Sequence, residues 1–168
     1  MDDTENRENM ATVHAQSEFD LIRIVAEFSR SRLPWYPLIL VFCTGKKYPS
    51  DCIPMKRIPE PATGHHFNDD FLRHLTSAFA ENESIHDGAV VFARASSSTH
   101  YAQSAWSVRI AAPHVVENAA PNRGAAYNSS LALSVAPDVD LVCLLVRDRT
   151  DFFSNGKIQF LTEGKGAS

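Results

Sequence analysis

The sequence has no long hydrophobic run and no excess of basic charge, and each absence excludes a class of protein. No run of about eighteen apolar residues occurs in the 168 residues, so we expect no membrane-spanning helix. The net charge of −4 leaves no basic surface for a nucleic-acid partner. The acidic first residues lack the basic start and apolar centre of a signal peptide. We therefore expect a cytoplasmic protein that binds neither nucleic acid nor membrane.

Cysteine is also scarce, and its spacing does not indicate a metal site. Of the three cysteines, Cys43 and Cys143 lie inside apolar runs and Cys52 lies between them in the sequence. This pattern favours buried free thiols in a reducing compartment. His65 and His66 have no third ligand at metal spacing, so a solvated pair is the favoured interpretation.

The length and the hydrophobic content predict one domain. With 44% hydrophobic residues, a chain of 168 residues fills one core of ordinary size. Residues 1–16 are acidic, show no apolar periodicity and are predicted to be a flexible tail. The domain is expected to span residues 17–163, and residues 164–168 are expected to be a frayed end.

Apolar periodicity predicts alternating helices and strands. A helix should begin at Glu18, with Ser17 as its N-cap, and a buried strand should follow over Pro37–Cys43. Residues 44–66 are predicted to be a long loop, with a short edge strand at Ile53–Ile58, and a second helix should follow a cap at Asn68 or Asp69. The remaining predicted elements are strands over Gly88–Arg94, Trp106–Ala112 and Asp140–Arg147, a helix over Tyr127–Val135, and a hairpin joining Thr150–Ser154 to Lys157–Thr162 through Asn155-Gly156.

This order of elements predicts the fold class. Strands alternate with helices, and two of the strands are long apolar runs of the kind that is buried on both faces. We therefore predict an α/β fold with a central twisted sheet that is flanked by helices on both faces. The C-terminal hairpin indicates that the sheet is mixed and not purely parallel.

One segment carries a functional signal. The stretch DFLRHLTSAFAENESIHDGAVVF contains a helix, a short polar turn, and then His86, Asp87, Gly88 and Ala89 leading into a strand. A carboxylate at the entrance of a strand can hold a divalent cation beside phosphates, and a neighbouring glycine lets a ligand approach the backbone. An Asp-Gly pair alone is more often only a turn.

This segment resembles the signature of the diadenylate cyclase family. The resemblance implies a diadenylate-cyclase-like fold in which Asp87 holds Mg²⁺ or Mn²⁺ and helps to activate the ribose 3′-hydroxyl. It also implies that His86 and the backbone of Gly88 and Ala89 lie beside the nucleotide. The likeness covers roughly residues 67–162.

The second family motif is altered in this chain. The family has Gly-Thr-Arg-His-Arg, whereas this chain has Gly124, then Ala125-Ala126, and then Tyr127 and Asn128. The basic side chains of the motif meet the triphosphate, and each charge-assisted hydrogen bond contributes roughly 1.5–3 kcal/mol. Their loss predicts weak or absent cyclase activity.

A third family feature, an acidic stretch after the last core strand, is also reduced. Asp148 keeps one acid as a second candidate metal ligand, but Arg149 stands where another acid is expected.

Residues around the altered motif still form a candidate nucleotide-binding set. The start of the predicted helix offers backbone N–H groups to an anion. Arg123, Gly124 and Asn128 lie beside it, Ser129 adds a hydroxyl, and Tyr127 is a candidate for stacking on a base. The competing interpretation is that Ser129 and Ser130 are helix-start residues and that Tyr127 lies on the surface.

Three functions remain open at this point. The first is a nucleotide-binding sensor domain, with ATP-like or cyclic dinucleotide ligands, little or no cyclase activity, and an effector protein as a signalling partner. The second is an active diadenylate cyclase or related nucleotidyltransferase, which would need a homodimer because family members act as face-to-face pairs. The third is a non-catalytic interaction module that has kept only the fold.

Overall fold

The computed structural model describes residues 16–33, 35–112, 116 and 123–163, without the side chains of residues 160–163. The predicted tail up to residue 15 and the predicted frayed end at 164–168 lie outside this range. Gln16, which the sequence assigns to the tail, is buried, and its side chain donates to Phe67 O at 2.8 Å and accepts from Tyr101 N at 3.2 Å. The ordered domain therefore includes Gln16.

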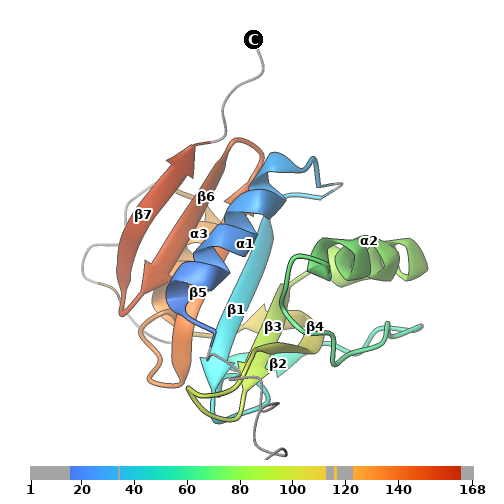
Figure 1. Cartoon of the computed structure of the whole chain (residues 1–168), viewed down its shortest axis with the longest axis horizontal. Coiled ribbons are helices and arrows are strands. Elements are labelled where there is room, and N and C mark those ends of the chain that lie inside the picture. The colour runs from blue at the N-terminus through green and yellow to red at the C-terminus, as the bar shows by residue number, and fades with distance from the viewer. Residues whose placement is uncertain (1–15, 34, 113–115, 117–122, 164–168) are drawn as a thin grey trace, which may run out of the picture.

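The described residues form a seven-stranded mixed sheet with three α-helices (Figure 1), as predicted. The strand order is β2-β4-β3-β1-β5-β6-β7; β1 and β3 are parallel, and the other neighbours are antiparallel. The elements are α1 (Glu18–Arg30), β1 (Leu38–Thr44), β2 (Cys52–Pro54), α2 (Phe71–Glu81), the 3-10 helix η1 (Glu83–His86), β3 (Ala89–Arg94), β4 (Ala102–Ile110), α3 (Ala125–Leu133), β5 (Val139–Val146), β6 (Arg149–Ser154) and β7 (Lys157–Glu163).

Helix α1 begins where the sequence predicts. Ser17 and Asp20 form a capping box, in which each side chain accepts a hydrogen bond from the other residue's backbone N–H. Phe19, which the spacing placed on the apolar face, is 74% exposed, because it lies on the opposite side of the helix from the buried residues. That buried stripe consists of Leu21, Ile24, Val25 and Phe28.

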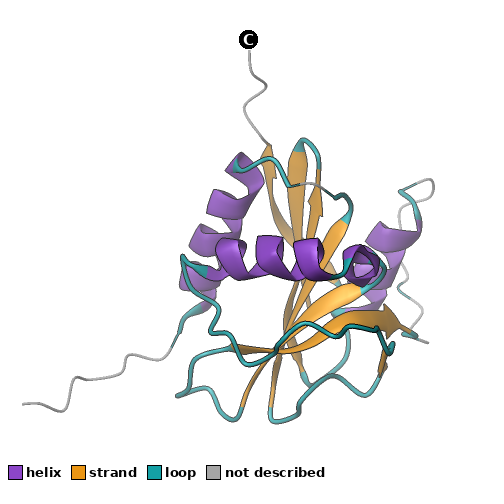
Figure 2. Ribbon diagram, turned by 90° about the vertical axis from the view of Figure 1, so that its right-hand side faces the viewer, coloured by secondary structure: helices purple, strands orange, loops and turns teal. Residues whose placement is uncertain are grey.

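The helices cover both faces of the sheet. One core cluster joins α1 and α2 to strand residues such as Leu40 and Phe92, and a second joins α3 to residues such as Val41 and Val91. Figure 2 shows the sheet almost edge-on, with α3 on the side opposite α1 and α2. The continuous apolar runs of β1, β3 and β5 follow from this arrangement, because a strand covered on both faces has no solvent-facing side.

Several element boundaries differ from the prediction. Strand β4 begins at Ala102, four residues before the predicted start, because the polar residue Gln103 is buried in it. Strand β2 is confined to Cys52–Pro54 and does not extend to Ile58. Helix α2 begins at Phe71, and Asn68 bonds to Asp70 N at 3.0 Å in a turn before the helix instead of capping it.

The C-terminal hairpin is confirmed. Asn155 and Gly156 both have positive φ, at 51° and 71°, as the tight turn between two antiparallel strands requires. None of the described helices is long and apolar enough to cross a membrane.

Candidate functional site

The segment that carries the family resemblance lies at the entrance of β3. Asn82 ends α2 and accepts a hydrogen bond from Ser84 N at 3.0 Å, which starts η1. Asp87 follows η1 as its C-cap, Gly88 has φ +112°, and β3 begins at Ala89. The predicted order of helix, polar turn and strand is therefore present.

The Asp87 side chain is exposed, but its carboxylate is paired with Arg57. Its carboxylate forms an ion pair with Arg57 at 2.9 Å, with 70% of the Asp87 side chain exposed. Arg57 also donates to Ser107 Oγ at 2.8 Å and to Asp87 O at 3.3 Å, and the Ser107 hydroxyl donates to Asp87 O. A guanidinium from the 44–66 loop thus lies against the carboxylate that the resemblance assigns to a metal.

Gly88 is required by the protein's own packing. A Cβ at this position would lie 2.8 Å from Val108 O, 2.9 Å from Val108 N and 2.9 Å from Met55 Cε. The close backbone approach that the sequence attributes to a ligand is therefore made by β4. Nearby Ser107 has φ 52°, a left-handed conformation that is rare for a residue with a side chain, and it lies where β4 loses register with β3.

The neighbours of Asp87 in the motif differ in exposure. His86 is exposed; its Nδ1 lies 2.6 Å from Glu83 O, and its ring stacks on Trp35 with centroids 6.2 Å apart. Ala89 is fully buried in β3 between Ile39 and Val108. Of the two, only His86 presents a side chain to solvent.

Helix α3 begins two residues earlier than predicted, directly after Gly124. Gly124 is the N-cap residue, with φ +85°, and it has no side chain that could accept a hydrogen bond from the N–H groups of the first turn. Asn128 is exposed, Ser129 is half-buried and Ser130 is buried. All three lie within the helix, so neither serine is a helix-start residue.

The interpretation of Tyr127 as a surface residue is wrong. Its side chain is 8% exposed, and its ring packs edge-to-face on Phe153 at 5.0 Å. The exposed Arg123 lies over the same ring at 5.5 Å. Tyr127 therefore anchors α3 to the sheet and positions Arg123 beside the helix N-terminus.

The sheet register brings the predicted residues to one end of the sheet. Ile39 pairs with Ala89, and Leu38 pairs with Leu145, so Asp87 before β3 and Asp148 after β5 lie at the same end. β1 separates β3 from β5, so the two strands that these acids flank lie two strand spacings, about 10 Å, apart. Asp148 is exposed.

The N-terminus of α3 is directed toward this end of the sheet. Ser134, at the C-terminus of α3, accepts a hydrogen bond from Gly156 N at 3.1 Å, beyond the end of β6. Tyr127, one turn into the helix, contacts Phe153 further back along β6. The first turn of α3 and Gly88 therefore approach the same end of the sheet.

The residues present do not provide a full metal-binding set. Among the described residues, no group of three or more His, Cys, Asp or Glu side chains is arranged to hold a metal ion. The Asp87 carboxylate at the Gly88 turn is already paired with Arg57. The donors therefore do not fit the divalent cation that the resemblance implies.

The thiols are structural, as predicted. Cys43, Cys52 and Cys143 are all free and buried. Burial raises the pKa of Cys43 and of Cys52 to about 12 and raises the pKa of Cys143 well above its usual value. Such thiols are protonated at neutral pH and are poor nucleophiles.

A polar network at the opposite end of the sheet was not predicted from the sequence. Asp140 accepts hydrogen bonds from Tyr101 Oη at 2.6 Å and from Thr44 Oγ1 at 2.5 Å. Arg94 donates to Thr44 at 2.9 Å and lies over the Tyr101 ring at 4.3 Å. Burial and the Asp140 carboxylate raise the pKa of Tyr101. The network joins the ends of β1 and β3 to the start of β5.

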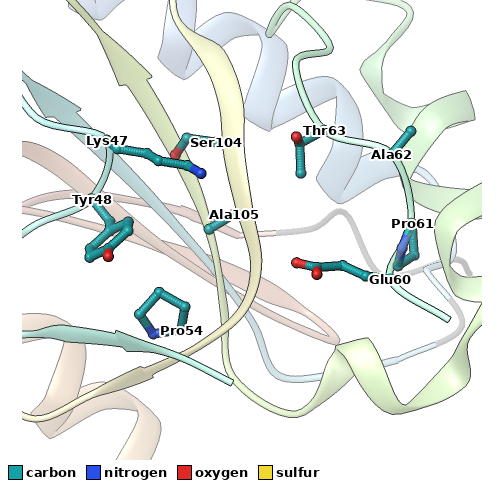
Figure 3. Close-up of a pocket in the computed structure, with 9 residues that line it drawn as sticks. All are labelled: Lys47, Tyr48, Pro54, Glu60, Pro61, Ala62, Thr63, Ser104 and Ala105. Carbon is teal, nitrogen blue, oxygen red and sulfur yellow. The ribbon is translucent and has the colours of Figure 1, made fainter. Parts of the chain in front are cut away.

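A cavity of about 380 Å³ lies on the outer side of β4 (Figure 3). It is lined by residues of four segments, the turn after β1, β2, the loop between β2 and α2, and β4, and none of the predicted site residues is among them. The lining residues are Lys47, Tyr48, Pro54, Glu60, Pro61, Ala62, Thr63, Ser104 and Ala105.

Comparison with known proteins adds little. No family model matches the chain, and no curated protein matches it. A crystal structure described as a hypothetical membrane spanning protein from Bacillus cereus is similar, with 17% sequence identity and a TM-score of 0.49. The match covers 86% of this chain and 63% of that protein, so this chain spans less than two thirds of its length. A likeness at this level carries no conclusion about activity.

Proposed function

We propose that the protein is a nucleotide-binding domain similar to diadenylate cyclases, with weak or no cyclase activity and a sensor role. The observation that carries the proposal is the placement of the Asp87-Gly88 turn. It lies at the same end of the sheet as the first turn of α3, as the register and the α3 contacts indicate. An ATP-like ligand or a cyclic dinucleotide would place a phosphate at that turn of α3.

The first turn of α3 suits a phosphate. The free N–H groups of a helix N-terminus and the helix dipole both favour an anion. Gly124 carries no side chain to cap these groups, and a Cβ there would meet no atom of the described residues within 4 Å. Arg123 supplies a positive charge beside the turn.

Two features support the loss of catalysis. Residues 125–128 are Ala, Ala, Tyr and Asn, so no basic side chain follows Gly124 to stabilise charge in the transition state. The Asp87 carboxylate is paired with Arg57, so a metal ion would have to displace the guanidinium to bind it. We therefore expect that a nucleotide binds without needing a divalent cation.

A thermal-shift screen tests the proposal. The purified protein is heated with ATP, GTP or cyclic di-AMP, in EDTA and in Mn²⁺, and the same samples are analysed for products by mass spectrometry. A bound nucleotide raises the melting temperature by mass action. We expect a rise with at least one nucleotide in EDTA, a smaller rise for Arg123→Gln, and an unchanged rise for Arg109→Gln, which carries the same substitution on an exposed residue of β4.

Other outcomes identify the competing functions. A cyclic dinucleotide product that disappears in Asp87→Asn would show an active cyclase, and such a cyclase should sediment as a homodimer. No melting shift with any nucleotide would contradict nucleotide binding and favour an interaction module.

A further inference from the structure

The cavity beside β4 has walls that the fold holds in place. After β2, residues 55–64 form a loop beside β4 that is bonded to this strand at both ends. Met55 N donates to Ser107 O at 3.1 Å, and Gly64 N donates to Gln103 O at 2.8 Å. Between these points the described residues of the loop, which we call the arch, make no backbone–backbone hydrogen bond to β4. The cavity of about 380 Å³ lies in the space between them and is within the size range of small-molecule sites.

The arch is fixed along its length. Asn82 Nδ2 donates to Pro59 O at 2.6 Å, and the Trp106 indole N–H donates to Ala62 O at 3.0 Å. Prolines at 59 and 61 further restrict its backbone. The wall formed by residues 60–63 is therefore ordered without a ligand, which lowers the entropic cost of binding.

The opposite wall is fixed as well. Lys46 forms an ion pair with Asp138 at 3.3 Å and donates to Ser50 at 2.7 Å. Gly45 N donates to Arg94 O at 2.9 Å. These bonds hold the turn after β1, so that Lys47, the next residue along, faces the cavity.

Two opposite charges face the cavity from these two walls. In Figure 3 the Lys47 ammonium and the Glu60 carboxylate point inward from opposite sides of β4, over Ser104 and Ala105. Neither side chain has a hydrogen bond or an ion pair with another residue of the described ranges. Thr63 adds a hydroxyl to the lining, and Tyr48 adds an aromatic ring.

We propose that this cavity binds a small zwitterion, such as a free amino acid or a dipeptide, with its carboxylate against Lys47 and its ammonium against Glu60. A ligand with both charges satisfies both side chains. A nucleotide would pair with Lys47 but would bring its phosphates toward the Glu60 carboxylate, and like charges at close range repel. The proposal is independent of nucleotide binding at α3.

Calorimetric titration of the whole protein tests the proposal. The probes are the twenty free L-amino acids and glycylglycine. For each amino acid that binds, the titration is repeated with the matching primary amine, which lacks the carboxylate, and with the N-acetyl acid, which lacks the ammonium. We expect at least one zwitterion to bind with a millimolar or lower dissociation constant, and both matched analogues to bind at least tenfold more weakly.

Variants locate the binding. Lys47→Met and Glu60→Gln should each weaken it at least tenfold, and both change exposed residues, so the fold should be retained. The same substitutions outside the cavity, Lys157→Met and Glu81→Gln, should change the dissociation constant less than twofold. No binding by any zwitterion would overturn the proposal. An analogue that binds as tightly as its parent amino acid would also overturn it. A nucleotide whose affinity falls in Lys47→Met and rises in Glu60→Gln would overturn it as well, because it would show that the cavity binds an anion.

Discussion

Replacing Gly88 with alanine should destabilise the protein more than the same change at Gly45 or Gly124. All three glycines have positive φ, at +112°, +86° and +85°, so each alanine is strained by its backbone conformation. Among the described residues, the added Cβ meets other atoms at Gly88 alone of the three, at 2.8 and 2.9 Å from the Val108 backbone and at 2.9 Å from Met55.

The magnitude follows from two contributions. A residue held in a disfavoured backbone region costs about 1–3 kcal/mol. Overpacking against a fixed neighbour costs about another 1–3 kcal/mol, and the Val108 backbone can move only by distorting the pairing of β3 with β4. We expect Gly88→Ala to lower the free energy of unfolding by about 2–6 kcal/mol, and Gly45→Ala and Gly124→Ala to lower it by the strain alone.

Urea unfolding followed by circular dichroism measures these differences. The midpoint of Gly88→Ala should fall well below those of the two control variants, while the denaturant slope stays the same. Equal midpoints for all three variants would refute the reasoning, because they would show that β4 does not press on the Gly88 turn.

Four further predictions concern charges and thiols. Nucleotide binding by the unaltered protein is expected to be the same in EDTA and in Mn²⁺. Arg57→Gln removes the partner of the Asp87 carboxylate, so Mn²⁺ should strengthen nucleotide binding severalfold in this variant but not in Arg109→Gln. Binding by Arg57→Gln that stays the same in EDTA and in Mn²⁺ would contradict the assigned role of the guanidinium. Asp140→Ala should lower the free energy of unfolding by roughly 1–3 kcal/mol in the same urea assay, because it leaves the hydroxyls of Tyr101 and Thr44 without their acceptor. The control Asp148→Ala changes an exposed residue and should alter this free energy by less than about 0.5 kcal/mol. The three thiols should resist a thiol reagent at pH 8 until the protein unfolds, and fast labelling of the native protein would contradict their burial. Because two of the thiols have their pKa raised to about 12, the unfolded state loses its thiol protons first, and stability should decrease as pH rises from about 9 toward 12.

Local signals made much of the fold predictable. The Ser17 cap, the apolar runs of β1 and β5 and the Asn155-Gly156 turn each depend on neighbouring residues, and each is present in the structure. The start of β4 was placed too late because Gln103 is a polar residue that is buried in the sheet, and a local pattern assigns such a residue to a loop.

The candidate site was less predictable because its contacts are distant in sequence. Arg57 and Asp87 are thirty residues apart, and nothing near either residue indicates that they pair. The same holds for Gly88, whose neighbour Val108 comes from another strand, and for Tyr127, which the pattern left on the surface. The walls of the β4 cavity come from four separate segments, so only the folded chain brings Lys47 and Glu60 to one space.

The central claim is that a nucleotide phosphate binds at the first turn of α3, at the end of the sheet that holds Gly88. Titration of ATP into isotope-labelled protein in EDTA, followed by backbone amide NMR, tests it most directly. We predict that the largest shifts occur at the amides of Gly124, Ala125 and Ala126, with smaller shifts at Gly88. Shifts confined to the β4 cavity, or no shifts at millimolar ATP, would contradict the account.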